Sequence, residues 1–193
     1  MASLTSPEFA KKLTLSDGTT YGYVHIPPSS APSTSPSPTT TTNPNPKRRK
    51  PTFLLIHGAP SSSYIWHHQI NRLAKAGFGV LAPDLLGYGD SDCPEVSDAM
   101  EGLEKYHIKN VVPQVRELIS RVVFGDDGDG DGCDDDERVI GVGHDLGSPL
   151  LSHLYVHHKE IFSGLVFIAV GFVIVDGKLD YGMFLSFFLF ICG

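Results

Sequence analysis

The sequence predicts an α/β fold in which an N-terminal β-hairpin precedes a mostly parallel sheet. Short apolar runs alternate with segments of helical periodicity from residue 52 onward, and this order is typical of strand–helix–strand units. Residues 52–56 form a continuous apolar run, as expected of a strand that is buried on both faces. The length of 193 residues and the hydrophobic content of 41% fit about one domain with its own core.

The hairpin is predicted from two short runs near the N-terminus, residues 12–15 and 21–26. Ser16, Asp17 and Gly18 lie between the two runs, and these residue types favour a tight turn. After the strand at 52–56, the expected elements are a helix at 62–75, a strand at 79–82, a helix from Asn110 as N-cap to Val122, a strand at 138–142, a helix at 147–158 and a strand at 164–170.

Residues 27–50 are predicted to form a disordered insertion in a single core that extends over residues 1–193. The segment consists mainly of Pro, Ser, Thr and Asn and holds half of the chain's 14 prolines. Such a composition buries too little apolar surface to offset the entropy of ordering. The basic run at 47–50 could serve nuclear import or bind an anionic surface, but a solvated loop end is the favoured interpretation.

Residues 125–137 are predicted to form a second, acidic and flexible insertion. Seven Asp and one Glu lie within 126–137, whereas the net charge of the whole chain is -7. The rest of the chain is therefore close to neutral, and we expect no nucleic-acid partner. Alternating Asp residues from Asp127 onward match the start of a calcium-binding loop. The twelfth position is Arg138, which cannot supply the required bidentate carboxylate, so we expect no metal site there.

The composition favours a cytoplasmic protein. Cys93, Cys133 and Cys192 form no metal or disulfide pattern, which favours a reducing compartment. The N-terminal residues contain no apolar h-region of a secretory signal. The apolar runs at 161–175 and 183–192 are shorter than the ~18 residues of a membrane span. A membrane-associated tail is the less favoured alternative.

The segment Gly143-His144-Asp145-Leu146-Gly147 has the layout of a nucleophile elbow. It follows the predicted strand at 138–142, and a sharp strand-to-helix turn needs small residues on both sides of the nucleophile. A carboxylate at this position suits attack on an electrophilic sp³ carbon, such as that of an epoxide or an alkyl halide, through an enzyme ester. The alternative is an Asp that caps a helix, but the two glycines and the preceding strand favour a nucleophile at Asp145.

The segment His57-Gly58-Ala59-Pro60 directly follows the strand at 52–56. A loop at this place can direct a backbone N–H toward the nucleophile, and the N–H groups of Ala59 and Leu146 would then form an oxyanion hole. Taken alone, the motif could also be an ordinary turn between a strand and a helix. Residues 83–92 contain further glycines after the next strand, and we expect them to be architectural.

Together, residues 57–66, 83–92 and 143–147 resemble the α/β-hydrolase superfamily, and within it the soluble epoxide hydrolases that use an Asp nucleophile. The resemblance implies that Asp145 is the nucleophile and that Ala59 and Leu146 supply the oxyanion N–H groups. It implies a small-molecule epoxide as substrate, a vicinal diol as product and no cofactor. Haloalkane dehalogenase is an alternative, but such enzymes typically carry Trp at the position of Leu146. A Ser esterase is disfavoured because Ser148 lies three residues after the nucleophile position.

The resemblance also implies that the α/β-hydrolase fold is incomplete here. In the family, a cap domain, two late strands and the loops with the acid and the catalytic His follow the strand at 164–170. In this chain, residues 182–193 are expected to form an apolar tail that is atypical of the family. None of the nine His residues suits the role of base, and His153 and His157, spaced as a metal pair, lack a third ligand.

A chain that ends in this way is expected to turn over little epoxide. A non-catalytic, truncated relative that binds a partner is therefore the alternative function. The open edge of the strand at 164–170 predicts self-association.

Overall fold

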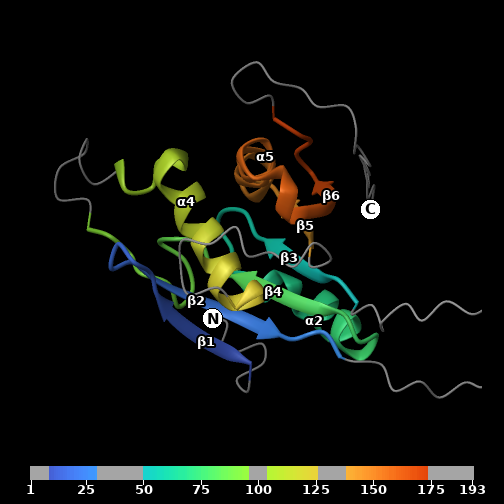
Figure 1. Cartoon of the computed structure of the whole chain (residues 1–193). Coiled ribbons are helices and arrows are strands. Elements are labelled where there is room, and N and C mark those ends of the chain that lie inside the picture. The colour runs from blue at the N-terminus through green and yellow to red at the C-terminus, as the bar shows by residue number, and fades with distance from the viewer. Residues whose placement is uncertain (1–8, 30–49, 96–103, 126–137, 174–193) are drawn as a thin grey trace, which may run out of the picture.

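The computed structural model describes residues 9–29, 50–95, 104–125 and 138–173. These residues form a six-stranded sheet in the order β1-β2-β4-β3-β5-β6 (Figure 1). The predicted insertion at 27–50, the acidic segment and the tail at 182–193 lie wholly or mostly outside the described residues. The predicted fold class, a mostly parallel α/β sheet with an N-terminal hairpin, is confirmed.

The N-terminal hairpin consists of β1 (Ala10–Thr14) and β2 (Thr20–Ile26), which pair antiparallel. Gly18 adopts a left-handed φ of 86° in the connecting turn, a conformation that glycine adopts without strain. The Asp17 side chain accepts a hydrogen bond of 2.8 Å from the Thr19 N–H. The turn chemistry expected from the sequence therefore closes the hairpin.

Four strands form the parallel part of the sheet: β3 (Thr52–Ile56), β4 (Gly79–Pro83), β5 (Val139–His144) and β6 (Phe162–Ile168). β3 pairs with both β4 and β5, and β5 pairs with β6. β6 begins two residues earlier than predicted and ends before Ala169. Ala169 has a φ of 69°, which an extended strand does not tolerate.

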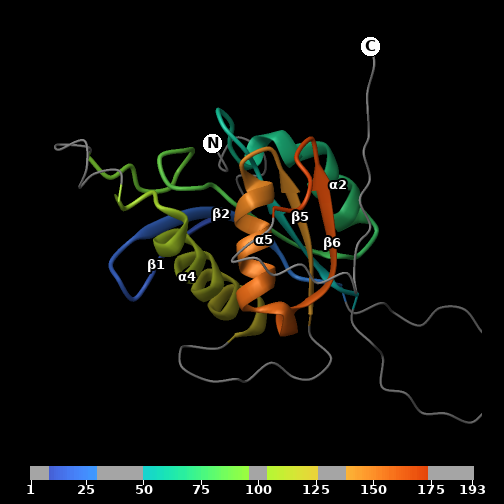
Figure 2. The ribbon, with the colours of Figure 1, turned by 90° about the horizontal axis from the view of Figure 1, so that it is seen from above.

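Helices cover both faces of the sheet, and Figure 2 shows α4 and α5 together on one side. α4 (Ile108–Ile119) and α5 (Gly147–His157) pack their buried residues on the side of Leu54 and Ile56. On the other face, the 3₁₀ turn η1 (Ser63–Trp66) leads into α2 (His67–Lys75), which packs near Leu55. No helix in the described ranges has both the length and the apolar composition that crossing a membrane requires.

The predicted start of α4 was wrong. His107, not Asn110, occupies the N-cap, and its side chain accepts a hydrogen bond from the Lys109 N–H. Asn110 lies inside the first turn, where its side-chain amide donates to the Glu104 carbonyl at 2.8 Å. The apolar period that continues to Val122 corresponds to a π-helical turn, η2 (Ser120–Phe124), which follows α4.

Candidate functional site

Asp145 occupies the turn between β5 and α5, at the carboxyl end of the parallel strands. Its φ of 50° is left-handed, which is uncommon for a residue with a β-carbon. Two hydrogen bonds hold this conformation. The Asp145 N–H donates to the Ile168 carbonyl at 3.2 Å, and the Asp145 carbonyl accepts from the Ser148 N–H at 2.9 Å. Strand β6 and helix α5 therefore both fix the backbone at Asp145.

The glycines on either side of Asp145 are required by close backbone contacts. A β-carbon on Gly147 would lie 2.5 Å from the Ile56 carbonyl oxygen, and one on Gly143 would lie 2.8 Å from the Gly147 carbonyl oxygen. These distances are shorter than van der Waals contact, so the first turn of α5 can approach β3 and β5 only without side chains at these positions. The Gly-x-Asp-x-Gly pattern follows from this packing.

The loop after β3 approaches the carboxylate of Asp145. The Ala59 N–H donates a hydrogen bond of 3.1 Å to Asp145 Oδ2, and a β-carbon on Gly58 would lie 2.5 Å from that same oxygen. Hydrogen bonds from the N–H groups of Leu146 and Ala59 hold the pKa of the Asp145 carboxyl below its ordinary value. The structure thus brings together the three residues that the sequence singled out.

Exposed apolar side chains belong to segments that follow the ends of the central strands. In the described part of the chain, the exposed large hydrophobic residues are Tyr64, Leu146 and Val170, which are 47%, 57% and 36% exposed. They follow β3, β5 and β6, respectively. The segments that follow the carboxyl ends of these strands therefore carry exposed apolar side chains, and Asp145, which is half-buried, lies in one of these segments.

Two side chains to which the sequence assigned no separate role hold the Ala59 loop. His57 is fully buried, and its Nδ1 lies 2.7 Å from the Gly58 carbonyl oxygen. The Ser61 hydroxyl donates to the same oxygen at 2.6 Å. The sequence signal for this arrangement is a histidine directly after a buried strand, with a serine four residues later. This pattern alone does not show which backbone carbonyl the two side chains bind, because that depends on the direction of the peptide groups.

His144 precedes Asp145 at the end of β5. Its ring packs edge-to-face against Trp66, with 6.2 Å between ring centroids. Within the described residues, no group of three His, Cys, Asp or Glu side chains could hold a metal ion.

Asp84 connects the loops that follow β3 and β4. The side chain is fully buried. It accepts hydrogen bonds from the Ser63 N–H at 2.7 Å and from the Asp90 N–H at 2.9 Å. Gly89, with a φ of 58°, lies so close to the carboxylate that a β-carbon there would collide with it. The loop at 83–92 therefore has an architectural role: it fixes the start of η1 next to the candidate site.

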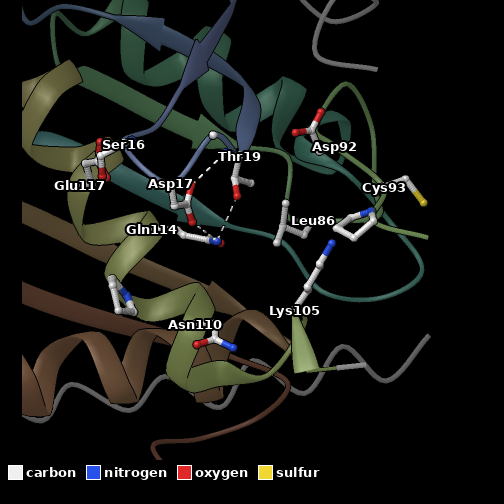
Figure 3. A pocket seen from close by; sticks show the side chains of 13 residues that line it. Ser16, Asp17, Thr19, Leu86, Asp92, Cys93, Lys105, Asn110, Gln114 and Glu117 are labelled. Carbon is white, nitrogen blue, oxygen red and sulfur yellow. Dashed lines mark hydrogen bonds between the residues drawn. The ribbon is translucent and has the colours of Figure 1, made fainter. Parts of the chain in front are cut away.

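A cavity of about 740 Å³ lies away from Asp145, between the hairpin turn, the loop after β4 and helix α4 (Figure 3). Its polar side chains largely satisfy one another. Gln114 donates to Asp17 at 2.8 Å and accepts from Tyr21 at 2.9 Å. Glu117 accepts from the Ser16 hydroxyl at 2.7 Å and from the Ser16 N–H at 2.8 Å. These bonds attach the hairpin to α4.

Replacing Glu117 with Gln is expected to lower the free energy of unfolding by about 1 kcal/mol at pH 7, because one charge-assisted hydrogen bond is weakened. Partial burial alone raises the pKa of the Glu117 carboxyl, but hydrogen bonds from Ser16 and Arg121 outweigh it and lower the pKa below 4.5. A lowered pKa in the folded state stabilises the fold above the ordinary pKa, and this stabilisation is lost as the pH falls.

The difference between E117Q and the unsubstituted chain should therefore shrink below about pH 4.5. Urea unfolding at a series of pH values measures it. Glu95→Gln, at an exposed position, serves as the control for loss of a surface carboxylate. A pH-independent difference for E117Q would contradict the assignment.

The chain matches known proteins over its central and C-terminal parts. The sequence profile described as "Alpha/beta hydrolase family" matches residues 53–191. Epoxide hydrolase A of Mycobacterium tuberculosis (strain ATCC 25618 / H37Rv) is 32% identical over 120 residues, which cover 62% of this chain and 32% of that protein. Epoxide hydrolase 3 of Siraitia grosvenorii is 32% identical over 123 residues, which cover 64% and 33%. The chain thus spans about a third of the length of these curated relatives.

Solved structures share the fold. Epoxide hydrolase VrEH1 from Vigna radiata gives a TM-score of 0.59 at 23% identity, with 86% of this chain and 40% of that chain covered. A loop variant of haloalkane dehalogenase DbeA from Bradyrhizobium elkanii gives 0.55 at 24% identity, with 83% and 40% covered. Because both types of enzyme match, the fold alone does not separate their reactions.

Proposed function

The chain belongs to the alpha/beta hydrolase family, and on that premise we propose that its site is of the epoxide hydrolase type, with Asp145 as the nucleophile. One carboxylate oxygen of Asp145 attacks a ring carbon of the epoxide, and the bond from that carbon to the epoxide oxygen breaks. The oxygen leaves as an alkoxide and takes a proton from water. The product of this step is an ester between Asp145 and the opened substrate.

In the second step, water adds to the ester carbonyl of Asp145, and the vicinal diol is released. The tetrahedral intermediate carries negative charge on an oxygen derived from the carboxylate. Backbone N–H groups that point at this oxygen stabilise that charge. We assign this role to Ala59 and Leu146, and the single observation that carries the proposal is the convergence of their N–H groups on the carboxylate.

The electrostatics of the site support a carboxylate that stays ionised. The two backbone hydrogen bonds lower the pKa of Asp145, and the residue precedes the N-terminus of α5, where negative charge is favoured. Because an ionised carboxylate is the nucleophilic form, Asp145 is available for attack at neutral pH. The exposed apolar residues nearby suit a substrate with apolar substituents.

Hydrolysis of the ester also needs a positioned base, which typically contributes ~10²–10⁴-fold to such a step. We propose that the 193-residue chain forms the ester much faster than it cleaves it. An aryl epoxide should therefore add its mass to the chain once, and the modified peptide should contain Asp145. Mass spectrometry of the intact chain and of its peptides measures both.

Asp145→Asn should abolish the modification, whereas Glu95→Gln, at an exposed position, should leave it unchanged. Equal modification of the Asn variant would contradict the proposal. Release of halide from a 1-bromoalkane, without reaction with the epoxide, would favour the dehalogenase alternative. Leu146 stands where dehalogenases typically have Trp, which counts against that alternative, but many epoxide hydrolases also carry Trp there, so this position does not by itself favour the epoxide.

A binding function without catalysis is the second candidate, and one observation favours it. Among the described strands, β6 pairs only with β5, and it contains no charged residue. An uncharged apolar edge is a template for pairing with another chain, so we propose self-association through this edge. Sedimentation of the same preparation separates the catalytic function from the binding function. A chain that stays monomeric at all concentrations and forms the Asp145 ester would exclude the binding function.

A further inference from the structure

We infer that His57 and Ser61 are positioning residues that direct the Ala59 N–H toward Asp145 by holding the opposite end of the same peptide group. This inference rests on the proposed function for its catalytic meaning, but its geometry is independent of it. The Gly58 carbonyl and the Ala59 N–H belong to one peptide group. Among the described residues, the only cis peptide is Ala59–Pro60, so the Gly58–Ala59 peptide is trans. In a planar trans peptide the C=O and N–H bonds point in opposite directions.

The consequence is that whatever holds the Gly58 oxygen also sets the direction of the Ala59 N–H. That oxygen receives two hydrogen bonds, from His57 Nδ1 at 2.7 Å and from Ser61 Oγ at 2.6 Å. A carbonyl oxygen accepts two such bonds, so both of its positions are filled. The N–H at the other end meets Asp145 Oδ2 at 3.1 Å. The peptide group is thus held at both ends.

The tautomer of His57 follows from its second contact. The Leu85 N–H lies 2.9 Å from His57 Nε2, and a backbone N–H can only donate. Nε2 must therefore be the unprotonated acceptor, and Nδ1 carries the proton that is donated to the Gly58 oxygen. Burial lowers the pKa of His57, which keeps the ring in this neutral form. The imidazole links the loop after β4 to the peptide that faces Asp145.

Ser61 provides the sharper test, because it is only partly buried and its hydroxyl can be removed with little loss of packing. In the isotope-labelled 193-residue chain, Ser61→Ala should move the amide proton resonance of Ala59 upfield, since its hydrogen bond to Asp145 weakens. The same variant should raise the pKa of Asp145 in a carboxyl NMR titration. It should also slow modification of Asp145 by an aryl epoxide about tenfold, because the attacking carboxylate is held less firmly in position.

Ser163→Ala is the matched control, because the Ser163 hydroxyl also donates to a backbone carbonyl, that of Val139, at 3.3 Å. It should change none of the three quantities, and Ser61→Thr, which keeps the hydroxyl, should restore them. An unchanged Ala59 resonance and Asp145 titration in Ser61→Ala would overturn the inference, as would equal changes in Ser163→Ala. The two NMR measurements need no epoxide. If the unsubstituted chain fails to react, the proposed function fails while the positioning role is still decided by the resonances.

Discussion

Gly58→Ala is expected to slow the reaction of Asp145 with an epoxide by about 100-fold or more. The added β-carbon would lie 2.5 Å from both Cβ and Oδ2 of Asp145. Rotation of the Asp145 side chain can move Oδ2 but not Cβ, whose position is fixed by the backbone, so the loop after β3 or the elbow must also shift. The carboxylate must then leave its place beside the Ala59 N–H, and a misplacement of about 1 Å is enough to cost ~10²-fold in rate.

The measurement is the rate of modification of Asp145, followed by mass spectrometry and compared with circular dichroism and the thermal midpoint. Gly164→Ala is the matched control, because a β-carbon there would meet nothing within 4 Å. It should react at the rate of the unsubstituted chain. A Gly58→Ala variant that reacts equally fast would show that contact between this loop and the carboxylate is dispensable.

Gly147→Ala is expected to destabilise the whole domain rather than the site alone. Its β-carbon would lie 2.5 Å from the Ile56 carbonyl oxygen and 2.8 Å from that of His57. These are backbone atoms of the central strand and the following loop, so relief requires a shift of α5 or β3. Overpacking of this kind costs ~1–3 kcal/mol, occasionally more. The better helix propensity of Ala recovers less than about 1 kcal/mol.

We therefore expect the thermal midpoint of Gly147→Ala to fall by about 2–8 °C, given ~2–4 °C per kcal/mol for a chain of this size. Gly171→Ala, where a β-carbon would meet nothing within 4 Å, should leave the midpoint unchanged. Calorimetry measures both. A Gly147→Ala variant as stable as the unsubstituted chain would mean that the elbow can widen without strain.

The two glycine variants distinguish an effect on the reaction of Asp145 from an effect on the stability of the domain. Gly58 faces a side chain and Gly147 faces backbone, although both look alike in the sequence. A loss of reaction in Gly58→Ala that exceeds its loss of stability, together with a loss of stability in Gly147→Ala, would separate the two roles.

The order and type of most elements could be predicted from the sequence, because hydrophobic periodicity reports burial directly. Strand β3 was predicted with its observed bounds. The start of α4 was missed, because capping depends on which side chain accepts from the free N–H groups of the first turn. His107 accepts from one of them, whereas the Asn110 side chain donates to the Glu104 carbonyl. The end of β6 was missed because the left-handed Ala169 leaves no signal in residue type.

For the site, the elbow and its neighbouring loop could be predicted from the sequence, since glycines at fixed spacing around Asp145 have a steric reason of their own. The sequence could not determine the direction of peptide groups. The tertiary structure alone decided that the Ala59 N–H points at Asp145, that His57 donates through Nδ1, and that Ser61 shares the same acceptor. A peptide group can face either way at the same residue types, and only the contacts of the folded chain select one orientation.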